Sequence, residues 1–165
     1  MDRLWTPWRY DFVSRAARTD EGCVFCSILS DPARDEENFV LCRGSSTAVI
    51  LNLYPYTVGH LLILAARHIA ALADANRGEL DEIIGWAQRC ETALQAEYRP
   101  DGFNLGFNLG RMAGAGVENH LHMHVLPRWA GDANFLSVIS ETRTLPEALP
   151  KTYARLLPRF RAFAG

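Results

Sequence analysis

Three histidines alternate with apolar residues in the segment HLHMHVL, residues 120–126. In an extended chain, side chains two residues apart lie on the same face, roughly 6–7 Å from one another. The segment therefore predicts a strand that carries His120, His122 and His124 on one face, while the apolar residues between them point the other way. Such a strand buries an apolar face and presents a polar, titratable one.

Simpler interpretations of the histidines exist. A single histidine on a strand is most often part of a solvated sheet face, but three in alternation favour a functional cluster. The cluster is also compatible with a metal site that has no catalytic role, since imidazole is the commonest metal ligand. That second interpretation stays open for His120.

The other apolar runs predict an α+β domain with a mainly antiparallel sheet of about five strands. Two of the runs are separated only by Gly44 and Ser45, which indicates a hairpin. The expected strands are residues 38–43, 46–52, 60–66, 103–109 and 120–126. The chain shows no repeat and no linker, so we expect a single domain over residues 1–165.

One long helix is predicted between the third and fourth strands. Asn76 and Glu79 have the spacing of a capping box, apolar residues then recur at helical spacing, and the helix should end near Arg99. The aromatic N-terminal arm, residues 1–18, has no clear period and is assigned no regular structure. The C-terminal tail, residues 140–165, contains a proline and predicts a short broken helix of unclear role.

Charge and composition exclude some classes of function. A formal net charge of −2 and a pI near 6.2 argue against a general nucleic-acid binder, so we expect a small-molecule partner. The N-terminus lacks the apolar run of a signal peptide, and no stretch reaches the roughly 18 apolar residues that span a bilayer. The sequence therefore predicts no membrane association and a cytoplasmic location.

Cys23 and Cys26 form a CxxC pair, a spacing suited to tetrahedral zinc. The pair is also compatible with a redox function or with two buried thiols. The other two cysteines stand alone, which fits reduced thiols better than a disulfide framework. A zinc site would need two further ligands.

The segment HLHMHVL resembles the pattern that names the histidine-triad superfamily. His60 within VGHLLILAARHI, Asn52 at the end of a strand, and the Asn-rich strand with its glycine loop resemble the same family. The resemblance covers about residues 23–135. WTPWR near the start and PRWAGDANF after the histidines are similar to the bacterial branch of diadenosine tetraphosphate phosphorylases and hydrolases.

This resemblance implies a nucleotide-cleaving enzyme. The central histidine, His122, would take the nucleotidyl group as a phosphoramidate, and water or phosphate would then release it. A neutral imidazole is a competent nucleophile if an acceptor holds its other nitrogen as N–H. His124 and His60 are the candidate donors to the nonbridging oxygens.

The resemblance also assigns substrate contacts. Asn52 resembles the residue that binds ribose and Asn108 the residue on the phosphate side, although turn asparagines are common. The backbone at Gly114, Ala115 and Gly116 is a candidate phosphate cradle or an ordinary turn. Many family members place a Gln and a Ser or Thr where this chain has Gly116 and Val117. A hydroxyl that would protonate the leaving group is therefore missing.

The family resemblance also implies a metal site and a homodimer. In its zinc-bearing members the ligands that complete the CxxC pair resemble His68 and His120. The chain should also form a twofold homodimer, because a five-stranded sheet with one main helix leaves an apolar surface. The long helix and the strand at residues 103–109 are the expected interface.

Four functions remain to be distinguished. The favoured one is cleavage of a dinucleoside polyphosphate, in particular diadenosine tetraphosphate. A nucleoside phosphoramidate hydrolase and a nucleotide-sensing module with slow turnover are the alternatives. A uridylyltransferase resembles a related branch, but His124 and the chain length count against it.

Overall fold

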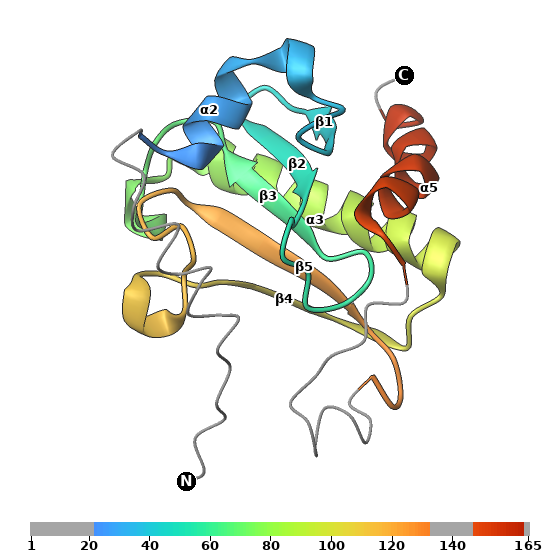
Figure 1. Ribbon diagram of the computed structural model, residues 1–165. Coiled ribbons are helices and arrows are strands. Elements are labelled where there is room, and N and C mark those ends of the chain that lie inside the picture. Colours follow the sequence, from blue (N-terminus) through green and yellow to red (C-terminus); the bar gives the residue numbers. More distant parts are fainter. Residues whose placement is uncertain (1–21, 133–146, 164–165) are drawn as a thin grey trace, which may run out of the picture.

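The computed structural model describes residues 22–132 and 147–163 and contains a five-stranded sheet in the order β1-β2-β3-β5-β4 (Figure 1). Every pair of neighbouring strands is antiparallel. The predicted α+β class is confirmed, and each predicted strand is present. The strands are β1 (Val40–Arg43), β2 (Thr47–Leu51), β3 (Leu61–Ala65), β4 (Gly102–Phe107) and β5 (His122–Arg128).

The long helix α3 (Arg77–Tyr98) begins and ends where the sequence predicts. Asn76 accepts a hydrogen bond from the backbone N–H of Glu79, and the Glu79 carboxylate accepts one from the N–H of Asn76, so the capping box is complete. At the other end Arg99 has a left-handed backbone with φ of 49°. The helix is thereby terminated before Pro100.

Helices cover both faces of the sheet. α3 and α5 (Leu149–Arg161) pack on one face together with the apolar residues that alternate with the histidines. α2 (Val24–Ser30) packs on the other face (Figure 1), where Phe25 and Ile28 form a buried cluster with apolar residues of β1, β2 and β3. The predicted alternation is confirmed, because the side chains of Leu121, Met123 and Val125 lie in the α3 core.

Two elements differ from the sequence-based expectation. The CxxC segment lies at the start of α2, a helix of seven residues that is too short to show a clear period. The C-terminal segment forms a continuous helix of 13 residues with Pro158 inside it, so the prediction of a short broken helix is wrong. Phe160 and Leu156 are fully buried against α3 and the sheet, and this burial outweighs the hydrogen bond that the proline removes.

The N-terminal arm and the first part of the predicted C-terminal tail lie outside the described residues. Within residues 22–132 and 147–163, no helix has both the length and the apolar character needed to cross a bilayer.

Candidate active site and metal cluster

His122 and His124 lie on β5, and His60 immediately precedes the neighbouring strand β3. The ring centroids of His122 and His124 are 5.0 Å apart, and those of His60 and His124 are 5.2 Å apart. The three side chains are only 5%, 9% and 1% exposed for His122, His124 and His60. The polar face of the strand is therefore buried, because α2 and the loop before β3 cover it, and the simpler interpretation of a solvated sheet face does not hold for these histidines.

A backbone N–H fixes the protonation of two of these rings. The N–H of Tyr56 donates to His60 Nδ1 at 3.2 Å, so this nitrogen is an acceptor and the proton sits on Nε2. His60 Nε2 in turn donates to His124 Nδ1 at 2.9 Å. His124 therefore carries its own proton on Nε2.

His122 has the opposite tautomer. Its Nδ1 donates to the backbone carbonyl of His120 at 2.7 Å, which leaves a lone pair on Nε2. A ring held in this way has an unprotonated nitrogen for attack on an electrophile.

Burial keeps all three rings neutral. It lowers the pKa of His60 to about 3, with further contributions from His124 and His122. Burial and the neighbouring His122 lower the pKa of His124 to about 4. The pKa of His122 is lowered as well, mainly by burial. At neutral pH the cluster combines one lone pair with N–H donors.

Both predicted asparagines contact this cluster. The side-chain nitrogen of Asn108 lies 3.4 Å from His124 Nε2. Both atoms carry protons, so this contact brings two donors side by side. Asn52 accepts a hydrogen bond from the N–H of Tyr54 and places its Nδ2 atom 3.2 Å from His60 Nδ1. Its amide therefore shapes the turn and orients His60.

Tyr56 is a member of the site that the sequence interpretation missed. Its ring lies 4.9 Å from that of His60 and stacks at 6.3 Å on that of His124. The signal available in the sequence was an aromatic residue four positions before a candidate histidine. Its ring contacts depend on how the intervening loop folds back.

In the glycine loop, two of the three candidate backbone N–H groups already donate hydrogen bonds within the loop. The N–H of Gly114 donates to the carbonyl of Arg111, and that of Ala115 donates to the carbonyl of Gly110. Among the described residues no hydrogen bond uses the N–H of Gly116. Of the three predicted N–H groups, that of Gly116 is therefore the one that remains a candidate donor to a phosphate oxygen.

A second cluster contains Cys23, Cys26, His68 and His120, whose ligand atoms all lie within 4.8 Å of one another. His120 Nε2 donates to the carbonyl of Ala65 at 2.7 Å, so its unprotonated Nδ1 faces the two sulfurs at 3.3 and 3.5 Å. His68 Nδ1 lies 3.2 Å from the sulfur of Cys26. Two thiols and two imidazoles at these separations could hold a metal ion, with the tautomer of His120 that ligation requires.

The two clusters are adjacent. His120 is the ligand in one, and its carbonyl orients His122 in the other. Phe25, between the two cysteines, places its ring 5.5 Å from that of His120 and 5.1 Å from that of His122. The histidines that share one face in the sequence pattern are thus divided between two sites.

Comparison with known proteins gives consistent matches. The family pattern of the HIT domain matches residues 33–131. A relative named AP-4-A phosphorylase from Mycobacterium tuberculosis is 36% identical over 162 residues, covering 92% of this chain and 80% of the relative. A shorter match, 30% identical over 48% of this chain and 52% of the relative, is to a bis(5'-adenosyl)-triphosphatase from Dictyostelium discoideum.

The fold has a similar solved counterpart. A zinc-bound histidine triad family protein from Mycobacterium smegmatis superposes with a TM-score of 0.69 at 26% identity. The superposition covers 87% of this chain and 96% of that one.

Proposed function

The chain belongs to the HIT domain family and is one of its enzymes, and we propose that it cleaves a dinucleoside polyphosphate through a covalent bond between His122 and the α-phosphorus. The observation that carries this proposal is the tautomer of His122, whose lone pair lies on Nε2 beside the Nε2–H of His124. Diadenosine tetraphosphate is the favoured substrate, because the relative with 36% identity is named for it.

In the first step His122 Nε2 attacks the α-phosphorus and the bond from phosphorus to the bridging oxygen breaks. The leaving nucleotide departs with the electron pair of this bond. When the substrate is diadenosine tetraphosphate, the leaving nucleotide is ATP. The donors of His124 and Asn108 stabilise the charge on the nonbridging oxygens, since a phosphate oxygen can accept hydrogen bonds from both.

In the second step an acceptor attacks the nucleotidyl group and restores free His122. Water gives AMP, and inorganic phosphate gives ADP, in both cases together with the ATP already released. The N–H of Gly116 is a further candidate donor, and Asn52 remains the candidate ribose contact.

The missing hydroxyl favours a polyphosphate as leaving group. An amine leaves well only when it is protonated, whereas a polyphosphate leaves as a stable anion. Gly116 and Val117 offer no side-chain proton at the position where the family resemblance leads us to expect Ser or Thr. Nucleoside phosphoramidates are therefore the weaker substrate class.

Product analysis of diadenosine tetraphosphate, with and without inorganic phosphate, tests the proposal. We expect ATP together with AMP or ADP, and a loss of at least about three orders of magnitude in turnover for His122→Ala. Binding of AMP should persist in this variant, and circular dichroism checks its fold. Full activity in the variant would remove the nucleophile, and tight binding without products would favour the nucleotide-sensing alternative.

We also propose that Cys23, Cys26, His68 and His120 hold a structural zinc ion, as the chemistry of the donor set supports. When bound, the ion links α2 to the segment that carries the histidines. Protein purified without added metal should contain close to one zinc per chain, measured by elemental analysis. Cys26→Ser should lose most of it, whereas Cys42→Ser, outside the cluster, should retain it. A stoichiometry near zero in reduced wild-type protein would refute the site.

A twofold homodimer is the proposed assembly. β4 is an edge strand of the sheet, and Leu105 on it is 42% exposed. Ile84 on α3 is 52% exposed. Pairing of these surfaces between two copies would bury both.

A further inference from the structure

The face of the sheet that carries the catalytic histidines continues past His124 towards the far end of β5. Gly106 lies opposite His124 in the register of β4 and β5, and Asn104 and Gly102 follow on the same face. On this same face, α2 packs over β1, β2 and β3, towards the edge of the sheet that lies farthest from β4 (Figure 1). No described helix covers this strip, which leads away from the proposed nucleophile.

Nothing in the described fold requires glycine at position 106. Its backbone does not have a positive φ, and a Cβ atom built there would meet no atom within 4 Å. Glycine inside a strand is destabilising relative to alanine, and a β-branched residue would suit this position better. The absence of a side chain beside His124 therefore points to a ligand that occupies the space.

The far end of the strip carries a fixed cation. Arg128 Nη1 donates to the side-chain oxygen of Asn104 at 2.6 Å, which confirms that the two residues share a face. Its Nε and Nη2 donate to the two carboxylate oxygens of Asp132 at 2.5 and 2.9 Å. Three of the five guanidinium N–H groups are used in the described structure, and the side chain is 46% exposed. A guanidinium held in this way offers its remaining donors to phosphate oxygens.

We propose that this strip, formed by Gly106, Asn104 and Arg128, binds the leaving half of a dinucleoside polyphosphate. The phosphate chain passes over Gly106, and its distal part contacts Arg128. The proposal rests on the proposed function, because it assumes that the α-phosphorus sits at His122.

Distances along the strand support this occupant. Arg128 follows His124 by four residues, which is about 13 Å in an extended chain. One phosphate group at the histidines does not span this distance, whereas a polyphosphate with a second nucleoside does. The strip thus selects for substrates with a long anionic leaving group.

Calorimetric binding of two ligands tests the proposal without turnover. One ligand is AMP, and the other is a diadenosine tetraphosphate analogue with methylene groups in place of the bridging oxygens. The wild-type chain should bind the analogue more tightly than AMP. Gly106→Val should weaken the affinity for the analogue by about tenfold or more and change the affinity for AMP by less than about twofold. The reason is that the new side chain blocks only the binding of the leaving half.

Arg128→Gln should weaken the affinity for the analogue by about five- to tenfold, and should make binding of the analogue less sensitive to salt. The matched control is Leu105→Val, a change at the adjacent residue, whose side chain points to the opposite face of β4. It should leave both affinities unchanged. Gly106→Ala provides a smaller change in case the valine variant does not fold.

Equal affinity of the wild type for the two ligands would overturn the inference, as would an unchanged analogue affinity in Gly106→Val or Gly106→Ala. An equal loss for AMP and analogue would also contradict it, since it would mean that His124 has been displaced. The proposed function fails separately: an active His122→Ala variant removes the nucleophile, whatever the binding data show.

Discussion

At the level of single residues, the backbone N–H of Tyr56 sets the chemistry of the cluster, because it determines the tautomers of His60 and then His124. Alternation in the sequence was sufficient to place His122 and His124 together. It could not reveal this hydrogen-bonded chain, which depends on the conformation of the loop before β3. Conversely, the carbonyl that orients His122 belongs to His120, only two positions away in the chain.

Acid sensitivity follows from the same buried rings. Histidine titrates near pH 6.5 in an unfolded chain, whereas burial holds the pKa of His60 at about 3 and that of His124 at about 4. Below pH 6.5 the unfolded chain takes up protons that the folded chain does not. The buried histidines therefore contribute fully to the free energy of unfolding above this pH, and their contribution falls as the pH decreases towards 4. Thermal unfolding midpoints measured between pH 7 and 4 should decline accordingly.

The variant His60→Asn isolates this effect. The groups that face His60 are His124, His122, Tyr56 and Asn52, and the substitution removes one titrating member of the set. The variant should be less stable at pH 7 but lose less stability on acidification than the wild type. Identical pH slopes for the two proteins would contradict the assignment of a neutral buried His60.

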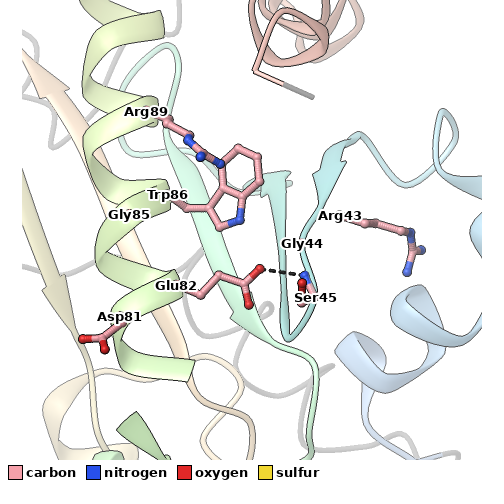
Figure 2. Close-up of a pocket in the computed structure, with 8 residues that line it drawn as sticks. All are labelled: Arg43, Gly44, Ser45, Asp81, Glu82, Gly85, Trp86 and Arg89. Atoms are coloured by element: carbon pink, nitrogen blue, oxygen red, sulfur yellow. Dashed lines mark hydrogen bonds between the residues drawn. The ribbon is translucent and has the colours of Figure 1, made fainter. Parts of the chain in front are cut away.

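At the level of helices and strands, a carboxylate on α3 anchors the β1–β2 turn. Glu82 accepts a hydrogen bond from the backbone N–H of Ser45 (Figure 2). It also accepts hydrogen bonds from the backbone N–H and the hydroxyl of Ser46. A Cβ atom on Gly44 would collide with this carboxylate, which explains the glycine that marks the hairpin in the sequence. Trp86 and the turn line a hollow on the α3 side of the sheet (Figure 2).

Glu82→Ala should therefore destabilise the fold by about 1–3 kcal/mol, because it leaves the turn donors without their acceptor. Equilibrium urea unfolding measures this change. Glu91→Ala, an exposed position on the same helix, should change stability by less than about 0.5 kcal/mol. Equal effects of the two substitutions would mean that the anchor contributes nothing specific.

Elements with strong local signals were predictable, and those stabilised by distant contacts were not. The capping box and apolar period of α3 are contained in its own sequence. α5 depends on burial of Phe160 and on the hydrogen bond from the Tyr153 hydroxyl to the carbonyl of Val40, more than 100 residues earlier in the chain. Such contacts leave no mark in the local pattern, and Pro158 gives a misleading one.

For the molecule as a whole, the proposed dimer predicts a concentration-dependent mass. Light scattering after size exclusion at micromolar concentration should give twice the chain mass of 18.5 kDa. Leu105→Arg should shift the mass towards that of one chain, because it places a charge on the β4 edge where two copies would meet. A wild-type chain that remains monomeric at this concentration would contradict the assembly.

The candidate site combines residues of very different origin. The metal ligands come from the N-cap and first turn of α2, from the loop after β3 and from the segment before β5, and only the spacing of the cysteines was visible locally. The family resemblance supplied the rest of the set, and the fold brings it together. The strip along β4, in contrast, became apparent only from the strand register.

Trapping the covalent intermediate tests the central role of His122 most directly. Wild-type protein is mixed with diadenosine tetraphosphate, quenched within one turnover at alkaline pH, digested and analysed by mass spectrometry. We predict an adenylyl group on the peptide that contains residues 120–126, with fragmentation placing it on His122. An adenylyl group on His124 or His60, or rapid turnover with no modified histidine, would contradict the mechanism.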